Sequence, residues 1–168
     1  PSKLDLTRDD GTKLSAKLNG TRLESLSETV KENGQTKEIQ WQKNGDKWLS
    51  NESPARERRN LSVTPEGTVK FNSESGVAHE IYKNGTRSEV DKDLIHRQYD
   101  AENKLAIISQ PNGDSRVLKY TNGELSSIQD RIGGSEKTWL RLAGGNNWSD
   151  GVKQETRNSL KIETDGSM

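Results

Sequence analysis

The sequence predicts an all-β protein in which sequential antiparallel β-hairpins form an extended, repeat-built sheet. Glycine-centred turn signals recur along the chain at the spacing of about 8–12 residues that is typical of all-β folds. Between them, polar and apolar residues alternate, as in strands with one buried face. The residues that we expect to form turns include Asn44, Gly45, Gly67, Asn112, Gly113, Asn122, Gly123 and Gly166. The sequence leaves open whether the sheet is a single layer, a half-shell or a thin sandwich.

The alternation is clearest in four segments, which are residues 13–18, 61–64, 68–71 and 159–163. Two further segments, residues 23–30 and 125–132, place apolar residues at positions i, i+3 and i+7, a spacing that also suits a short amphipathic helix. We favour strands in both places because hairpin turn signals flank them.

One hairpin can be predicted in detail, between Trp41 and Trp48. If Asn44-Gly45 forms a two-residue loop, Trp41 lies directly opposite Trp48. Cross-strand aromatic pairs of this kind contribute roughly 0.2–1 kcal/mol relative to alanine.

Composition excludes several classes of protein. The chain has 168 residues, of which 27% are hydrophobic and 31% are charged, and it has no cysteine. Disulfide frameworks and thiolate chemistry are therefore excluded. The 26 Lys and Arg balance the 26 Asp and Glu, so no overall field attracts nucleic acid or an anionic membrane. We expect a folded chain with a shallow core and a thin shape, no cofactor, no nucleic-acid partner and no membrane insertion.

The two ends of the sequence align with each other as copies of one repeat about 100 residues long. Residues 1–67 form the first copy, residues 103–168 form the second, and residues 68–102 are linking hairpins that occur once. Trp41 aligns with Trp139 and Trp48 with Trp148, so all four tryptophans are repeat positions. Both copies are partial, which predicts that the chain is a segment of a longer array.

A shorter motif resembles a known family. Tyr99-Asp100, followed by Leu105 and then by Gly113, is similar to the bacterial YD/RHS repeat, and the match is best over residues 95–139. Asn103 stands where that family usually has glycine. The resemblance implies hairpins joined into long sheets, a large secreted or cell-surface bacterial protein, and a scaffold that is not itself catalytic.

Four aromatic residues are the candidate binding site. Exposed indoles suit the faces of sugar rings, so the tryptophans could bind a polysaccharide; the alternative, which we favour, is that they cover the sheet. The four are Trp41, Trp48, Trp139 and Trp148.

The other chemistry-bearing residues do not form sites in the sequence. His79 and His96 each stand alone, without a partner at metal-ligand or triad spacing. The acidic residues before Gly11 lack the spacing of a calcium loop. The basic cluster of residues 56–59 is interpreted as a surface loop. We therefore expect no metal site and no enzyme.

The function that we expect is a non-catalytic structural segment of a large extracellular or cell-surface bacterial protein. Its partners would be adjacent repeats or neighbouring copies. The alternatives are a carbohydrate-binding module and a shell fragment of an RHS-type toxin. Open strand edges near Leu4 and Leu6 or near Leu160 and Ile162 could join copies head to tail into filaments. The sequence leaves the organism, the ligand and the copy number open.

Overall fold

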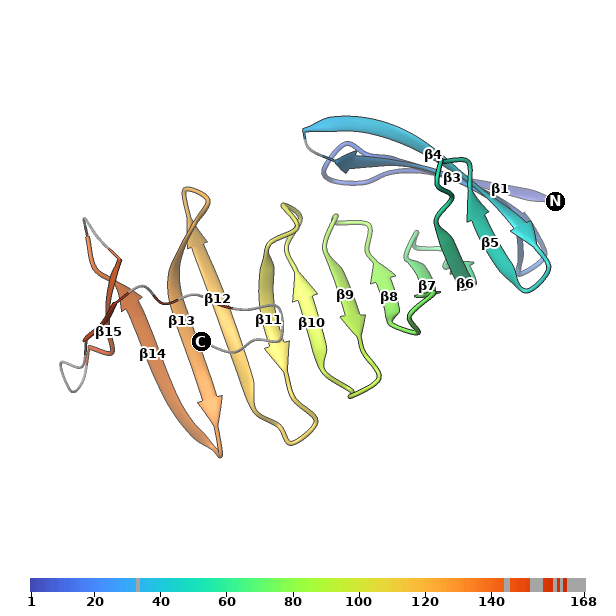
Figure 1. Ribbon diagram of the computed structural model, residues 1–168. Coiled ribbons are helices and arrows are strands. Elements are labelled where there is room, and N and C mark those ends of the chain that lie inside the picture. Colours follow the sequence, from blue (N-terminus) through green and yellow to red (C-terminus); the bar gives the residue numbers. More distant parts are fainter. Residues whose placement is uncertain (33, 144–145, 152–155, 159, 161, 163–168) are drawn as a thin grey trace. The chain divides into compact units, whose positions relative to one another are not determined.

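A computed structural model describes residues 1–32, 34–143, 146–151, 156–158, 160 and 162. The described residues contain strands and no helix, which confirms the predicted all-β class. Each strand is hydrogen-bonded to the next strand in the chain, in the order β1 to β16 (Figure 1). Within the described residues there is accordingly no helix of the length and apolar character that a membrane span requires.

Two compact units divide the chain. Unit 1 comprises residues 1–93 and 99–104, and unit 2 comprises residues 94–98 and 105–168. These limits differ from the predicted repeat boundaries, because residues 68–93 belong to unit 1. Whether the ends of the chain are copies of one repeat stays a prediction.

Unit 1 begins with long strands and continues with short ones. The strands of its first part are β1 (Ser2–Thr7), β2 (Lys13–Asn19), β3 (Arg22–Glu32), β4 (Gln35–Asn44), β5 (Lys47–Ser50) and β6 (Glu57–Val63). The strands that follow are β7 (Val69–Ser73), β8 (Ala78–Ile81) and β9 (Arg87–Val90), and the boundary between the units falls in β10 (His96–Tyr99).

The short strands are joined by turns that repeat every nine or ten residues. In each turn one residue has positive φ, which glycine adopts without strain. These residues are Gly67, Gly76, Gly85, Leu94, Asn103 and Gly113. Asn103, which replaces the glycine usual in the resembled motif, has a φ of 63°, and asparagine is among the non-glycine residues that tolerate this region best. Leu94 at 59° has no such tolerance.

Unit 2 contains strands of three to nine residues. They are β11 (Leu105–Ser109), β12 (Ser115–Thr121), β13 (Glu124–Ile132), β14 (Ser135–Arg141), β15 (Asn147–Ser149) and β16 (Thr156–Asn158). Figure 1 shows β11 to β14 side by side in chain order. The two ambiguous segments, residues 23–30 and 125–132, are strands in β3 and β13, as we favoured.

Unit 1 has a deeper core than the composition suggested. Its strands fold over a shared interior, and β3 contacts β6 although the two are not neighbours in the sheet. The side chain of Leu6 in β1 also packs at Gly67, in the turn before β7. The buried apolar residues of this core are Leu14, Ala16, Leu23, Leu26, Ile39, Trp41, Trp48, Leu61 and Val69. The expectation of a shallow core is therefore wrong for unit 1.

The core of unit 2 is smaller. Leu118, Ile128, Trp139 and Trp148 are buried in it, and partly buried neighbours pack around them. Leu160 and Ile162 belong to that outer set, but neither lies in a strand. The rest of the predicted strand 159–163, and Gly166, fall outside the described residues.

The hairpin between β4 and β5 has a different register from the predicted one. Asn44 pairs with Lys47, so Gly45 and Asp46 form the loop, and Trp41 lies opposite Ser50 rather than Trp48. Gly45 has a φ of 65°, as the first loop residue of a type II′ turn requires. Because the shift keeps both indoles on one face, each still reaches the core.

Candidate functional site

The most densely charged buried site of unit 1 surrounds Glu28 in β3. Its carboxylate, with a side chain 0% exposed, lies 2.7 Å from Nη1 of Arg58 and 3.4 Å from Nη2 of Arg8. Trp41 Nε1 donates a hydrogen bond of 3.0 Å to the carboxylate oxygen Oε1. The charges come from the turn after β1, from β3 and from β6, so the site joins parts of the sheet that are not neighbours.

Arg58 corrects the interpretation of residues 56–59 as a surface loop. Its guanidinium lies 3.9 Å from the ring centroids of both Trp41 and Phe71. Burial lowers the pKa of Arg58, and Glu28 opposes that shift. An irregularity in β6 accompanies this burial, because the register shifts between Arg59 and Ser62 and Asn60 has a φ of 51°, so Arg58 and Leu61 are both buried although they lie three residues apart. Arg59 stays on the surface and pairs with Glu57 at 2.8 Å. Strict alternation counted back from Leu61 would have placed Arg58 on the outer face, so the sequence pattern alone does not reveal its burial.

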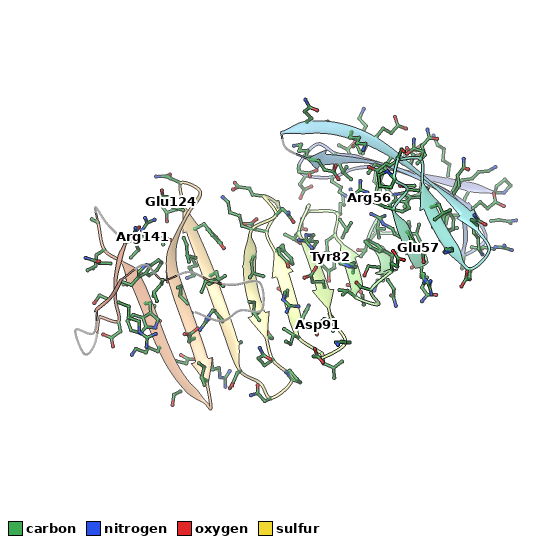
Figure 2. All side chains as sticks on the ribbon, viewed as in Figure 1. Arg56, Glu57, Tyr82, Asp91, Glu124 and Arg141 are labelled. Carbon is green, nitrogen blue, oxygen red and sulfur yellow. The ribbon has the colours of Figure 1, made fainter. Side chains whose placement is uncertain are left out.

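Arg56, which is labelled in Figure 2, has a different environment, with a side chain that is 46% exposed. It donates hydrogen bonds of 2.5 and 2.9 Å to Glu52 and lies 3.0 Å from Glu32. The hydrogen bonds from Arg56 hold the pKa of Glu52 at about 2. Arg56 is thus already neutralised by carboxylates of the protein, which disfavours a phosphate site there.

Unit 2 has its own buried acid, Asp130 in β13. Arg116, directly opposite on β12, contacts it with two hydrogen bonds of 2.5 and 3.0 Å. An open cavity of about 290 Å³ adjoins the pair and is lined by Ile108, Gln110 and Ile132 among others. The arrangement is a bidentate salt bridge, a geometry that fixes orientation as well as charge.

The sheet around the two acids has matching details. Trp41 pairs with Leu26 and Trp139 pairs with Ile128, next to Glu28 and Asp130 respectively. Each unit also has a tryptophan in register with an arginine; the pairs are Trp48 with Arg58 and Trp148 with Arg157. A further correspondence is a register irregularity between adjacent residues of β2 and of β12, at Lys17/Leu18 and Lys119/Tyr120.

The four tryptophans are buried, with exposures of 1% for Trp41, 4% for Trp48, 1% for Trp139 and 3% for Trp148. A ring that stacks on a sugar must present a face to solvent. The geometry therefore argues against a polysaccharide platform and for the interpretation that we favoured, in which these indoles cover the sheet.

His79 is held in a ladder of polar and aromatic side chains. It stacks on Phe71 with ring centroids 4.9 Å apart, and its Nδ1 lies 3.7 Å from Glu89. Burial lowers the pKa of His79, with Glu89 acting in the opposite direction. Within the described residues no cluster of His, Cys, Asp and Glu is arranged to hold a metal ion, and His96 is not part of one.

Tyr99 and Asp100, the pair that resembles the YD motif, have structural partners. Tyr99 donates a hydrogen bond of 2.8 Å to Glu89, and the Arg87 guanidinium lies 3.5 Å from its ring centroid. The Asp100 carboxylate accepts hydrogen bonds from the backbone of Glu102 and Lys104. The tyrosine thus fastens a strand and the aspartate closes a turn.

The residues that we expected to form turns in unit 2 also have structural roles. Asn122 and Gly123 both have positive φ, at 53° and 83°, as a type I′ turn requires. Asn112 accepts a hydrogen bond of 3.0 Å from the backbone of Asp114, and the carboxylate of Asp114 accepts one of 2.8 Å from Gly133.

Comparison with known proteins does not supply a function. No model of a protein family matches the chain, and neither a curated protein nor a solved structure matches it.

Proposed function

We propose that this chain is a non-catalytic structural segment of a larger secreted or cell-surface protein. The observation that carries the proposal is the strand order, in which every strand pairs with its sequence neighbours from β1 to β16. A sheet built in this way gains length by adding hairpins, and it needs no long-range crossover to do so. Adjacent repeats or neighbouring copies would be its partners.

The chemistry of the buried charges supports a structural role. Glu28 has no solvent access and its oxygens already face two arginines and an indole N–H. A general base must reach the proton that it abstracts, and a carboxylate enclosed in this way does not. Arg116 and Asp130 are likewise occupied by each other. These groups join strands.

A tandem chain tests the proposal. Two copies of the sequence joined by a flexible Gly/Ser linker should unfold at a higher urea concentration than the single chain, because repeats in an array stabilise their neighbours. The control is the single chain with the same linker and an unrelated folded domain. An equal midpoint for the tandem and the control would contradict the proposal.

A second measurement addresses carbohydrate binding. Soluble polysaccharides should leave the tryptophan fluorescence of the single chain unchanged, because all four indoles are buried. Saturable quenching by one polysaccharide, together with an unchanged tandem midpoint, would replace the structural role with a binding role.

A further inference from the structure

The edge of unit 1 at β1 has a charge pattern that is complementary to itself. Among the described residues β1 pairs with β2 alone, so its other edge is unpaired. Lys3 and Asp5 lie on the outward face of this strand, with side chains 67% and 57% exposed. Leu4 and Leu6 point to the other face and pack against the core.

The backbone groups that face the free edge can be assigned from the turn after β1. Arg8 N donates to Thr12 O at 2.8 Å, so Arg8 and Thr12 form a hydrogen-bonded pair. Hydrogen-bonded and non-hydrogen-bonded pairs alternate along an antiparallel ladder. Leu6 and Leu4 are therefore bonded to β2, whereas the N–H and C=O groups of Lys3, Asp5 and Thr7 point away from it.

We propose that β1 pairs antiparallel with β1 of a second copy of this chain, about a twofold axis at Leu4. In this register Lys3 of each copy lies opposite Asp5 of the other and exchanges two main-chain hydrogen bonds with it. Leu4 meets its own counterpart at a non-hydrogen-bonded position, which extends the apolar face of the core across the junction.

The charges select this register over its neighbours. An axis at Lys3 would place two lysines opposite each other, and an axis at Asp5 would place two aspartates opposite each other. Like charges directly opposite destabilise a strand pair. A register shifted by a single residue would place the free N–H and C=O groups of one copy opposite residues of the other copy whose groups are already bonded to β2. An axis at Leu6 would preserve the hydrogen bonds but would place Asp5 opposite Thr7. Among the axes within β1, only the axis at Leu4 places Lys3 opposite Asp5 on both sides.

This junction is isologous, since both copies use the same edge, so it closes at a dimer. It therefore differs from the head-to-tail filament that the sequence suggested. It also does not depend on the structural role proposed above. The tandem chain and its control can both be made with K3D, which weakens the dimer and leaves the tandem test unaffected.

Sedimentation velocity over a range of concentrations tests the dimer. The unaltered chain should shift from monomer to dimer as its concentration rises, and K3D and D5K should each weaken the dimer at least tenfold. The double variant K3D/D5K should restore it, because opposite charges again face each other. The matched controls are K43D and E24K on β4 and β3, which carry the same charge changes away from the edge.

Cross-linking tests the register, because the chain has no native cysteine. In oxidised glutathione, L4C should form a disulfide-linked dimer at least tenfold faster than L6C, since Leu6 would lie opposite Ser2 of the other copy. A chain that stays monomeric at high concentration, an association that K3D and D5K leave unchanged, equal cross-linking of L4C and L6C, or species larger than a dimer would each overturn the proposal.

Discussion

Each unit buries a carboxylate inside its β-sheet, but the two units neutralise that carboxylate with arginines from different places. In unit 1 the residue opposite Glu28 on β2 is Leu14, and the neutralising arginines come from a turn and from β6. In unit 2 the residue opposite Asp130 on β12 is Arg116 itself. The glutamate is longer than the aspartate by one methylene, which suits it to partners beyond the adjacent strand.

This difference determines what each ion pair holds together. Arg116 and Asp130 fasten two strands that the backbone ladder already joins. Arg58 and Glu28 link β6 to β3, which share no ladder. The charges of unit 1 therefore close the sheet over its core, whereas those of unit 2 add to an existing pairing.

The largest expected effect comes from neutralising the two acids. E28Q leaves two buried arginines without a counter-ion and should cost unit 1 about 3–5 kcal/mol. D130N leaves Arg116 beside an open cavity that water can enter, so its cost should be smaller, about 1–2 kcal/mol. Urea unfolding of both variants measures the two losses. A larger loss for D130N than for E28Q would break the comparison.

A matched pair of glycine substitutions gives the next effect. Gly67 and Gly113 have nearly equal φ, at 89° and 91°, so alanine should cost about 1–2 kcal/mol of backbone strain at either position. A Cβ at Gly67 would also lie 2.1 Å from Cδ1 of Leu6, whereas nothing lies within 4 Å at Gly113. Displacing Leu6 should add about 1 kcal/mol or more to the cost of G67A.

The control for this pair is L6A/G67A. Removing the leucine side chain relieves the clash, so the further cost of G67A in an L6A background should fall to that of G113A. Thermal unfolding of the four chains measures the coupling. If G67A costs the same with and without Leu6, the close packing of β1 against the turn before β7 is wrong.

Leu94 offers a stabilising change in the same series of turns. It has a φ of 59° and is 65% exposed, so its side chain strains the backbone without contributing much packing. L94N should raise the stability by up to about 1 kcal/mol, because asparagine tolerates this conformation. N103L is the opposite change and should lower the stability by more, because it also removes the hydrogen bond of 2.6 Å that Arg87 Nε donates to Asn103. A stability unchanged in both variants would contradict the account of these turns.

The smallest effect is a pH dependence confined to unit 1. The pKa of Glu52 is lowered from 4.5 to about 2 in the fold. A carboxyl with a depressed pKa contributes stability above its unfolded pKa, and this contribution is lost as the pH falls through the folded value. E52Q should therefore flatten the fall in stability between pH 4.5 and pH 2. Urea midpoints measured across that range check it, and equal slopes for both chains would contradict it.

Patterns local to the sequence predicted much of the fold. Period-two alternation and Asn-Gly or Asp-Gly turns were enough to place the strand at residues 13–18 and to favour strands at 23–30 and 125–132, as the structure confirms. The predicted loop at Asn44-Gly45 was wrong by one residue, because glycine can occupy the first or the second loop position depending on the turn type. A shift of one residue moves the cross-strand partner of Trp41 without changing its face.

The buried charges were harder to predict, because they depend on contacts between distant strands. Nothing adjacent to Glu28 in the sequence indicates that Arg8 and Arg58 surround it. Strict alternation from Leu61 would place Arg58 on the outer face, and the irregularity between Arg59 and Ser62 that accompanies its burial has no signal in the sequence pattern. The core of unit 1 became deep because β6 folds back over β3, a tertiary contact that composition does not encode.

Native-state hydrogen exchange of E28Q tests the central claim most directly, namely that buried charges hold each unit together by joining its own strands. Mass spectrometry should find faster exchange in β2 to β7 and unchanged exchange in β12 to β14, because Glu28 acts within unit 1. D130N should give the reverse pattern. Unchanged protection around Glu28, or equal loss of protection in both units from either variant, would contradict the claim.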